Sequence, residues 1–119
     1  MSFTTANMAT GMDAAAAAVT HIAWSENGST ESGNVAPTAV TLKAATNANP
    51  SVVANNGSLE SAPASSGCTI THWAFKSATA LQTTWNELPD AAVLLAGGKI
   101  TVADGALKEA WYQTTSAPL

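Results

Sequence analysis

The chain has 119 residues, of which 46% are hydrophobic and only 10% are charged, and its formal net charge at pH 7 is −4. It contains no arginine, and its four lysines lie far apart, so no basic stripe is available to neutralise phosphates. We therefore expect no direct binding to nucleic acid or to an anionic membrane. The low charge indicates a neutral surface that favours subunit contacts, because burying an unpaired charge is costly.

A chain of this length is expected to form a single domain over residues 1–119, with a short C-terminal tail at 113–119. Alanine inflates the hydrophobic fraction, so the predicted core is thin. The single cysteine, Cys68, cannot form an internal disulfide, and the N-terminus has no signal-peptide pattern. Folding in a cytoplasm is the simplest expectation.

The first predicted element is a helix from about residue 5 to residue 18, which a threonine at its start can cap. Four apolar residues recur at spacings of four, three and four, which places them on one helical face. They are Met8, Met12, Ala15 and Val19. We favour packing of this face on the core over docking of a partner, although the small alanine side chains would permit a close approach.

Residues 20–112 are expected to be rich in strands, because short β-like runs alternate with turn residues. The predicted strands are 20–25, 38–44, 51–54, 58–62, 68–76, 81–85, 99–102 and 107–112. Residues 87–95 are compatible with an extended connection or a short helical turn. The pattern predicts a mainly β, β-sandwich-like domain with one N-terminal α-helix.

Two dipeptides predict tight hairpins, Asn56-Gly57 and Asp104-Gly105, because each supplies the positive backbone angles of a two-residue turn. Each lies between two predicted strands. We expect the second hairpin, residues 99–112, to belong to the folding core, with Trp111 buried against the strand that precedes the turn.

The segment 26–37 is a run of small polar residues with almost no apolar anchor. It is expected to be a long, exposed loop that a neighbouring molecule orders. On this interpretation the loop is dispensable for folding and needed for assembly.

The sequence marks out no catalytic centre. Cys68, His72 and His21 could offer three metal ligands, but structural zinc normally takes four and the usual Cys-x-x-Cys pairs are missing. The Gly97-Gly98-Lys99 segment lacks the upstream glycine of a phosphate-binding loop and is interpreted as a turn. We expect no enzymatic activity, no metal and no cofactor.

Large apolar side chains are the candidates for an interface. With only two Phe and one Tyr in the chain, the tryptophans must build the core as well as any contact surface. The interface candidates are Trp24, Trp73, Trp85, Trp111, Met8 and Met12. A thin core and exposed tryptophans predict self-association, with a homotrimer as the expected state. A carbohydrate-binding module that uses the Trp side chains is the alternative from another functional class.

Two segments resemble a known family. Residues 69–75 read Thr-Ile-Thr-His-Trp-Ala-Phe, and residues 96–107 read Ala-Gly-Gly-Lys-Ile-Thr-Val-Ala-Asp-Gly-Ala-Leu. The first resembles the Thr-Val-Thr-His-Val-Gly-Leu strand, and the second the closing hairpin, of small virion proteins of tailed bacteriophages, especially phages of actinobacteria. The family often has an aromatic-Ala-Arg sequence before its second strand. Residues 35–42 here have no arginine, so no role of that residue carries over.

The resemblance implies a structural protein of the virion, assembled in the cytoplasm of a bacterial host. Family members are described as minor capsid, decoration or tail-fibre-like proteins. The implied partners are therefore other copies of this chain and the major capsid protein. A capsid decoration or minor capsid protein is the first expectation, and a tail or fibre component is the alternative.

Overall fold

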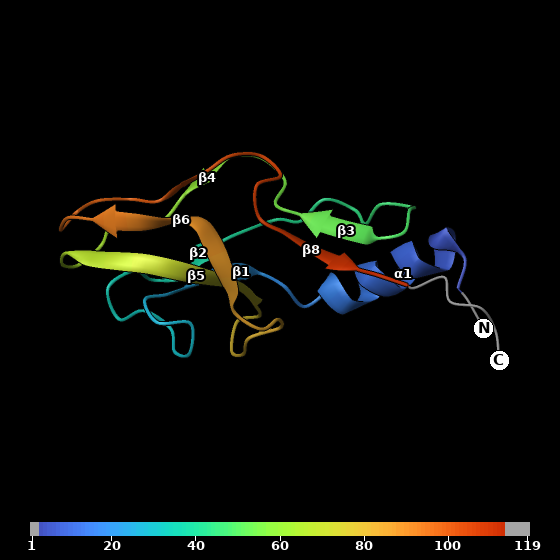
Figure 1. Ribbon diagram of the computed structural model, residues 1–119, viewed down its shortest axis with the longest axis horizontal. Coiled ribbons are helices and arrows are strands. Elements are labelled where there is room, and N and C mark those ends of the chain that lie inside the picture. The colour runs from blue at the N-terminus through green and yellow to red at the C-terminus, as the bar shows by residue number, and fades with distance from the viewer. Residues whose placement is uncertain (1–2, 114–119) are drawn as a thin grey trace.

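A computed structural model describes residues 3–113. Figure 1 shows an elongated molecule with a β-sheet at one end, a helix at the other, and a two-stranded ribbon that extends over both. The predicted fold class is confirmed, because residues 3–113 are mainly β, with antiparallel sheets in a sandwich-like arrangement and one helix near the N-terminus.

The helix, α1 (Thr5–Ala16), begins where the side chain of Thr4 accepts a hydrogen bond from the backbone N–H of Asn7 at 3.1 Å. Met8 and Met12 are its buried residues, and the helix packs against strand β3 (Ser51–Ala54). These two methionines therefore belong to the core, as the favoured interpretation of the helical stripe predicts. The helix ends two residues before the predicted end, where the chain turns toward the sheet.

Both ends of the described chain meet beside the helix (Figure 1). The side-chain amide of Gln113 accepts a hydrogen bond from the backbone N–H of Phe3 at 2.6 Å and donates one to the carbonyl of Phe3 at 2.8 Å. The side chain of Asn49 makes the same double contact with the backbone of Gln113, at 2.7 and 3.0 Å. Two amide side chains thus replace a β-ladder in holding these segments together.

The central sheet has four antiparallel strands in the order β2-β1-β5-β6. Their bounds are β1 (His21–Ser25), β2 (Thr38–Ala39), β5 (Cys68–Lys76) and β6 (Asn86–Leu94). Trp24 of β1 lies opposite Trp73 of β5, and only 1% and 5% of their surfaces are exposed. These cross-strand neighbours form the centre of the sheet's inner face.

Residues 81–95 correct one expectation and decide between two alternatives. The predicted strand 81–85 forms only an isolated bridge, between Leu81 and Lys76. Residues 87–95, which were compatible with an extended connection or a short helical turn, belong almost entirely to strand β6. The pairing of β6 with β5 shifts register between Ile70 and His72. This irregularity breaks the alternation of apolar residues from which a strand is predicted, and Pro89 is tolerated because β6 lies at the sheet edge.

The other four strands of the described chain form a long antiparallel ribbon in two parts. Strand β3 (Ser51–Ala54) pairs with β8 (Lys108–Trp111), and β4 (Leu59–Glu60) pairs with β7 (Thr101–Val102). Both predicted hairpins are therefore wrong in their pairing, because the strands that flank each turn pair with strands across the ribbon instead of with each other. The β4–β7 part lies over the sheet and the β3–β8 part lies beside the helix (Figure 1).

The two turns that were predicted to close hairpins meet in the middle of this ribbon. The glycines do adopt positive φ, +89° at Gly57 and +72° at Gly105, so the turn residues were identified correctly. The carboxylate of Asp104 accepts a hydrogen bond from the backbone N–H of Gly57 at 2.8 Å. A contact between turns, which no local sequence pattern encodes, thus replaces two separate hairpins.

Asn55, which is fully buried, joins the two parts of the ribbon. Its side-chain NH₂ donates to the carbonyls of Gly57 at 2.9 Å and Ala103 at 3.0 Å, and its side-chain oxygen accepts from the N–H of Leu107 at 2.9 Å. Its backbone N–H donates to the carbonyl of Leu107, and its carbonyl accepts from the N–H of Gly105. One side chain thus satisfies three backbone groups where the strand ladder is interrupted.

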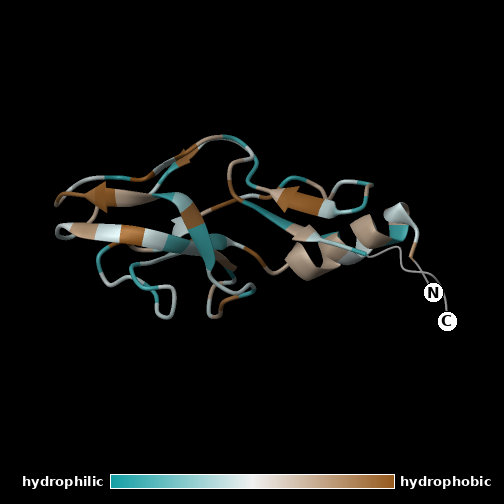
Figure 2. Ribbon diagram, in the orientation of Figure 1, coloured by the Kyte–Doolittle hydropathy of each residue, from teal (hydrophilic) through white to brown (hydrophobic). Residues whose placement is uncertain are grey.

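A single hydrophobic cluster joins the sheet, the ribbon and the helix. Figure 2 shows apolar segments on the sheet and on the ribbon above it. The ribbon contributes Val53, Ile100, Val102 and Leu107, the helix contributes Met12, and the sheet contributes Ile22, Trp24, Ile70, Trp73 and Phe75. Layer packing of sheet against ribbon therefore supplies most of the core.

The loop 26–37 covers the second face of the sheet. Ala23 and Ser25 alternate with the inner-face residues of β1 and are nevertheless fully buried. Gly28 lies directly on the ring of His72 in β5, where a Cβ atom would come within 2.9 Å of two ring atoms. Both faces of the β1–β5 pair are thus covered by this chain itself.

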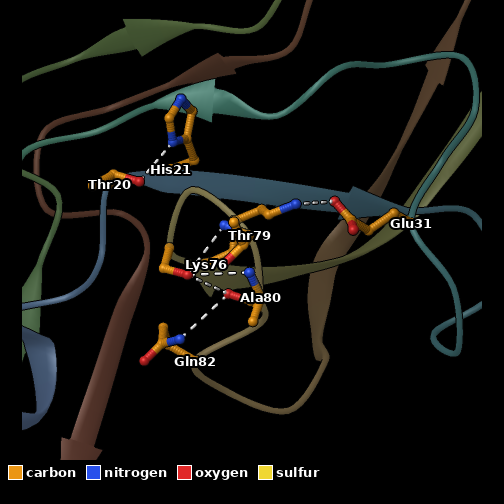
Figure 3. Close-up of polar contacts among 8 residues, drawn as sticks. Thr20, His21, Glu31, Lys76, Thr79, Ala80 and Gln82 are labelled. Carbon is orange, nitrogen blue, oxygen red and sulfur yellow. Dashed lines mark hydrogen bonds and ion pairs between the residues drawn. The ribbon is translucent and has the colours of Figure 1, made fainter.

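The expectation that this loop lacks an anchor is wrong. Val35 is buried in the hydrophobic cluster, and the carboxylate of Glu31 lies 2.9 Å from the Nζ of Lys76, whose side chain is only 13% exposed (Figure 3). The hydroxyl of Ser25 also donates to the carbonyl of Thr30 at 2.6 Å. A lone valine in a polar run carries no periodic signal, so the sequence did not reveal this anchor.

Replacing Asn55 with alanine is expected to lower the free energy of unfolding by about 3 kcal/mol, because three buried backbone groups lose their partner. Urea denaturation measures this change. The control is Asn56→Ala, which removes an exposed amide one residue away and is expected to change stability by less than about 0.5 kcal/mol. Equal effects of the two substitutions would contradict the bridging role of Asn55.

Replacing Val35 with alanine is expected to destabilise the protein by about 2 kcal/mol, because it opens a cavity in the core. The exposed neighbour provides the control, and Ala36→Ser is expected to leave the thermal midpoint nearly unchanged. Calorimetry distinguishes the two. A Val35→Ala protein as stable as the parent would restore the interpretation of an unanchored loop.

Candidate functional site

Four of the six interface candidates lie inside the chain's own core. Met8 and Met12 are buried under the helix, and Trp24 and Trp73 are buried in the sheet. The indole N–H of Trp24 also donates to the hydroxyl of Thr38 at 2.9 Å, so its polar atom is satisfied within the chain. These four side chains are therefore not exposed for contact with another subunit.

The other two candidates are more accessible. Trp85 is half-buried just before β6, and Trp111 is 41% exposed at the end of β8. The expectation that Trp111 is buried against residues 99–102 is wrong, because β8 pairs with β3 and brings the indole to the helix. There it lies over Gly11, where a Cβ atom would come 2.5 Å from the ring. Glycine at this helical position leaves room for the indole.

The three residues weighed as metal ligands do not form a cluster. The Nδ1 of His72 lies 2.7 Å from the hydroxyl of Thr71, and the Nδ1 of His21 lies 2.7 Å from that of Thr20. Within residues 3–113, no group of three His, Cys, Asp or Glu side chains is placed to hold a metal ion. Burial raises the pKa of the Cys68 thiol, and the nearby charge of Glu26 raises it further.

No helix in the described part of the chain is long and apolar enough to cross a bilayer.

Asp104, a carboxylate with a lowered pKa, lies between the two turns of the ribbon. The backbone N–H of Gly57 lowers the pKa of Asp104, and a hydrogen bond from Lys43 at 3.1 Å lowers it further. Both contacts tie exposed loops to the ribbon beside Asn55. Lys43 and Asp104 form an ion pair with each other, so we assign these two side chains a structural role.

A pocket of about 230 Å³ opens where the helix, ribbon and sheet meet. Its apolar wall includes Phe75 and Val53, and the helix contributes Ala15. Glu109 and Trp111 line it from β8, and Thr83 lines it from the loop before β6. Sequence reasoning missed this pocket, because its walls come from segments whose pairing was predicted differently.

The loop that borders this pocket is held by a compact polar turn after β5. The hydroxyl of Ser77 accepts hydrogen bonds from the backbone N–H groups of Thr79 at 3.3 Å and Ala80 at 3.1 Å. The side chain of Gln82, a pocket residue, donates to the carbonyl of Ala80 (Figure 3). This turn fixes one rim of the pocket relative to the end of β5.

Among the described large hydrophobic residues, the two most exposed lie on and just after the edge strand β6. Val93 is 77% exposed and Leu95 is 81% exposed. Among residues 3–113, β6 pairs only with β5 in its sheet, and no described strand pairs with its other edge. Sequence reasoning missed this surface, because residues 87–95 were not identified as a strand.

A scan against protein-family models and searches of curated proteins and solved structures gave no match to this chain.

The lowered pKa of Asp104 predicts a pH dependence of stability. A depressed pKa in the folded state contributes stability above the ordinary aspartate pKa of about 3.9, and this contribution disappears as the pH falls through the folded-state value. The stability lost on Asp104→Asn should therefore be largest near pH 7 and should shrink below about pH 4.

Urea denaturation between pH 7 and pH 2 measures this difference. The control is Asp90→Asn, which causes the same change in net charge at a carboxylate with no hydrogen bond or ion pair to residues 3–113. A loss on Asp104→Asn that is constant with pH would contradict the stabilising role of the carboxylate.

Proposed function

We propose that this chain is a non-enzymatic structural protein of a tailed-bacteriophage virion. It acts as a capsid decoration or minor capsid protein on the outer face of the shell, with a homotrimer as its assembled form. The major capsid protein is its partner, and assembly takes place in the cytoplasm of the bacterial host. A tail or tail-fibre component is the alternative location.

The observation that carries this proposal is the exposed edge of the sheet. An edge strand with outward apolar residues favours pairing with another chain, and proteins that remain monomeric usually protect such an edge with charge or twist. In β6 the acidic residues and Pro89 lie in the first half, which leaves Val93 and the adjacent Leu95 outside that protection. A contact surface therefore covers residues 92–95.

The low charge of the chain supports the same proposal. Each of the three ion pairs among the described residues has an exposed carboxylate, and Lys76 is the most buried of the six side chains that form them. A surface of small neutral residues can be buried between subunits without stranding charges. The carbohydrate-binding alternative retains only Trp85 and Trp111, because Trp24 and Trp73 offer no free ring face.

Self-association through β6 is tested by Leu95→Lys. Light scattering on the parent protein at micromolar concentration is expected to give the mass of three chains, and the substitution is expected to shift the protein toward monomer, because it places a charge in the contact. The control is Leu81→Lys, the same exchange at another exposed leucine away from the β6 edge. A parent protein that is monomeric at all concentrations would contradict self-association.

The virion role is tested separately on particles of the phage that encodes this sequence. Mass spectrometry of gently purified virions should detect the chain in many copies, and the Leu95→Lys protein should show reduced occupancy. Labelling by electron microscopy then separates a shell location from a tail location. Particles that lack the chain altogether would overturn the proposal.

A further inference from the structure

A pocket of about 230 Å³ lies where three parts of the molecule meet, and the hydrophobic core does not fill it. Met12 and Ala15 of the helix form one wall, Val53 and Ala110 of the ribbon form another, and Phe75 lies at its base. Phe75 is almost fully buried, so the pocket reaches the hydrophobic core. An apolar cavity of 150 Å³ already accepts a benzene-sized molecule, so this volume suits one ring or a short alkyl chain.

We propose that this pocket binds a small organic cation, an alkyl- or arylammonium ion whose apolar part enters the pocket and whose ammonium group stays at the rim. The class of ligand follows from the chemistry of the lining. The walls are mostly apolar, and the one ionisable side chain among the lining residues is Glu109. This site is independent of the virion role and of the contact surface proposed at residues 92–95.

The carboxylate at the rim is available for such a cation. Glu109 is half-buried, and its Oε1 accepts a hydrogen bond from the Nδ2 of Asn86 at 2.5 Å, which orients the carboxylate. None of the three ion pairs among residues 3–113 involves Glu109. A negative group without a cationic partner beside an apolar wall attracts cations and repels anions.

An aromatic side chain on the same strand strengthens the selection for a cation. Trp111 lines the pocket two residues after Glu109, on the same side of β8, and 41% of its surface is exposed. Gly11 leaves the space in which the indole lies against the helix. A cation held near the face of an indole is attracted by the ring, and aromatic side chains recognise ammonium groups in this way.

Benzylamine is the probe for this site, with benzyl alcohol and benzoate as neutral and anionic analogues of similar shape. Titrations followed by amide chemical shifts should move the signals of Ala15, Thr83 and Ala110. We expect benzylamine to bind about tenfold more tightly than benzyl alcohol, and benzoate to bind more weakly than both. Equal affinity for the amine and the alcohol, or no shifts at these residues, would overturn the proposal.

Two substitutions and a matched control locate the binding. Glu109→Gln keeps an oxygen for Asn86 and should remove the preference for benzylamine over benzyl alcohol. Ala15→Leu fills the mouth from an exposed helical position and should abolish binding of both molecules, whereas Ala14→Leu, on the same helix outside the pocket lining, should leave both affinities unchanged. Retained binding in Ala15→Leu, or a retained amine preference in Glu109→Gln, would overturn the assignment.

Discussion

The architecture depends on how one buried amide bridges a break in the ribbon. Between β3 and β4, and again between β7 and β8, the strand ladder stops for several residues, and Asn55 supplies the hydrogen bonds that the ladder omits. An unsatisfied backbone group in this position would cost about as much as several buried methylene groups would gain. The bridge lets a single ribbon pack on the sheet at one end and on the helix at the other. The pocket opens where these two packings meet, lined by residues of the helix, the ribbon and the end of β5.

The sequence predicted those features of the fold that depend on residues close together along the chain. The methionine stripe of the helix, the long strand β5 and the positive φ of Gly57 and Gly105 all follow from short-range chemistry. Which strands pair does not, because the contact of Asp104 with Gly57 spans 47 residues. An Asp-Gly turn between two apolar runs favours a hairpin locally, and the tertiary hydrogen bonds around Asn55 override that preference.

The candidate sites were even less accessible to sequence reasoning. Trp111 and Met12 were marked as large apolar residues, but only their three-dimensional setting separates a half-exposed pocket wall from a buried core position. Glu109 carried no signal at all, since a glutamate between lysine and alanine is typical of a solvent-facing strand residue. The sequence also did not reveal that Val93 and Leu95 lie at a sheet edge. The irregular pairing of β6 removes the alternation of apolar and polar residues from which a strand is predicted.

The contact between Phe3 and Gln113 has a consequence for how the chain can be rearranged. Residues 110 positions apart are held within hydrogen-bond distance, so a few added residues could join them with little further loss of chain entropy. New ends could then be opened in the exposed turn at 77–80, which the Ser77 hydroxyl organises locally. A circularly permuted chain of this kind would keep every strand of the sheet and ribbon intact, and a fused passenger would then leave the molecule beside the sheet instead of beside the helix.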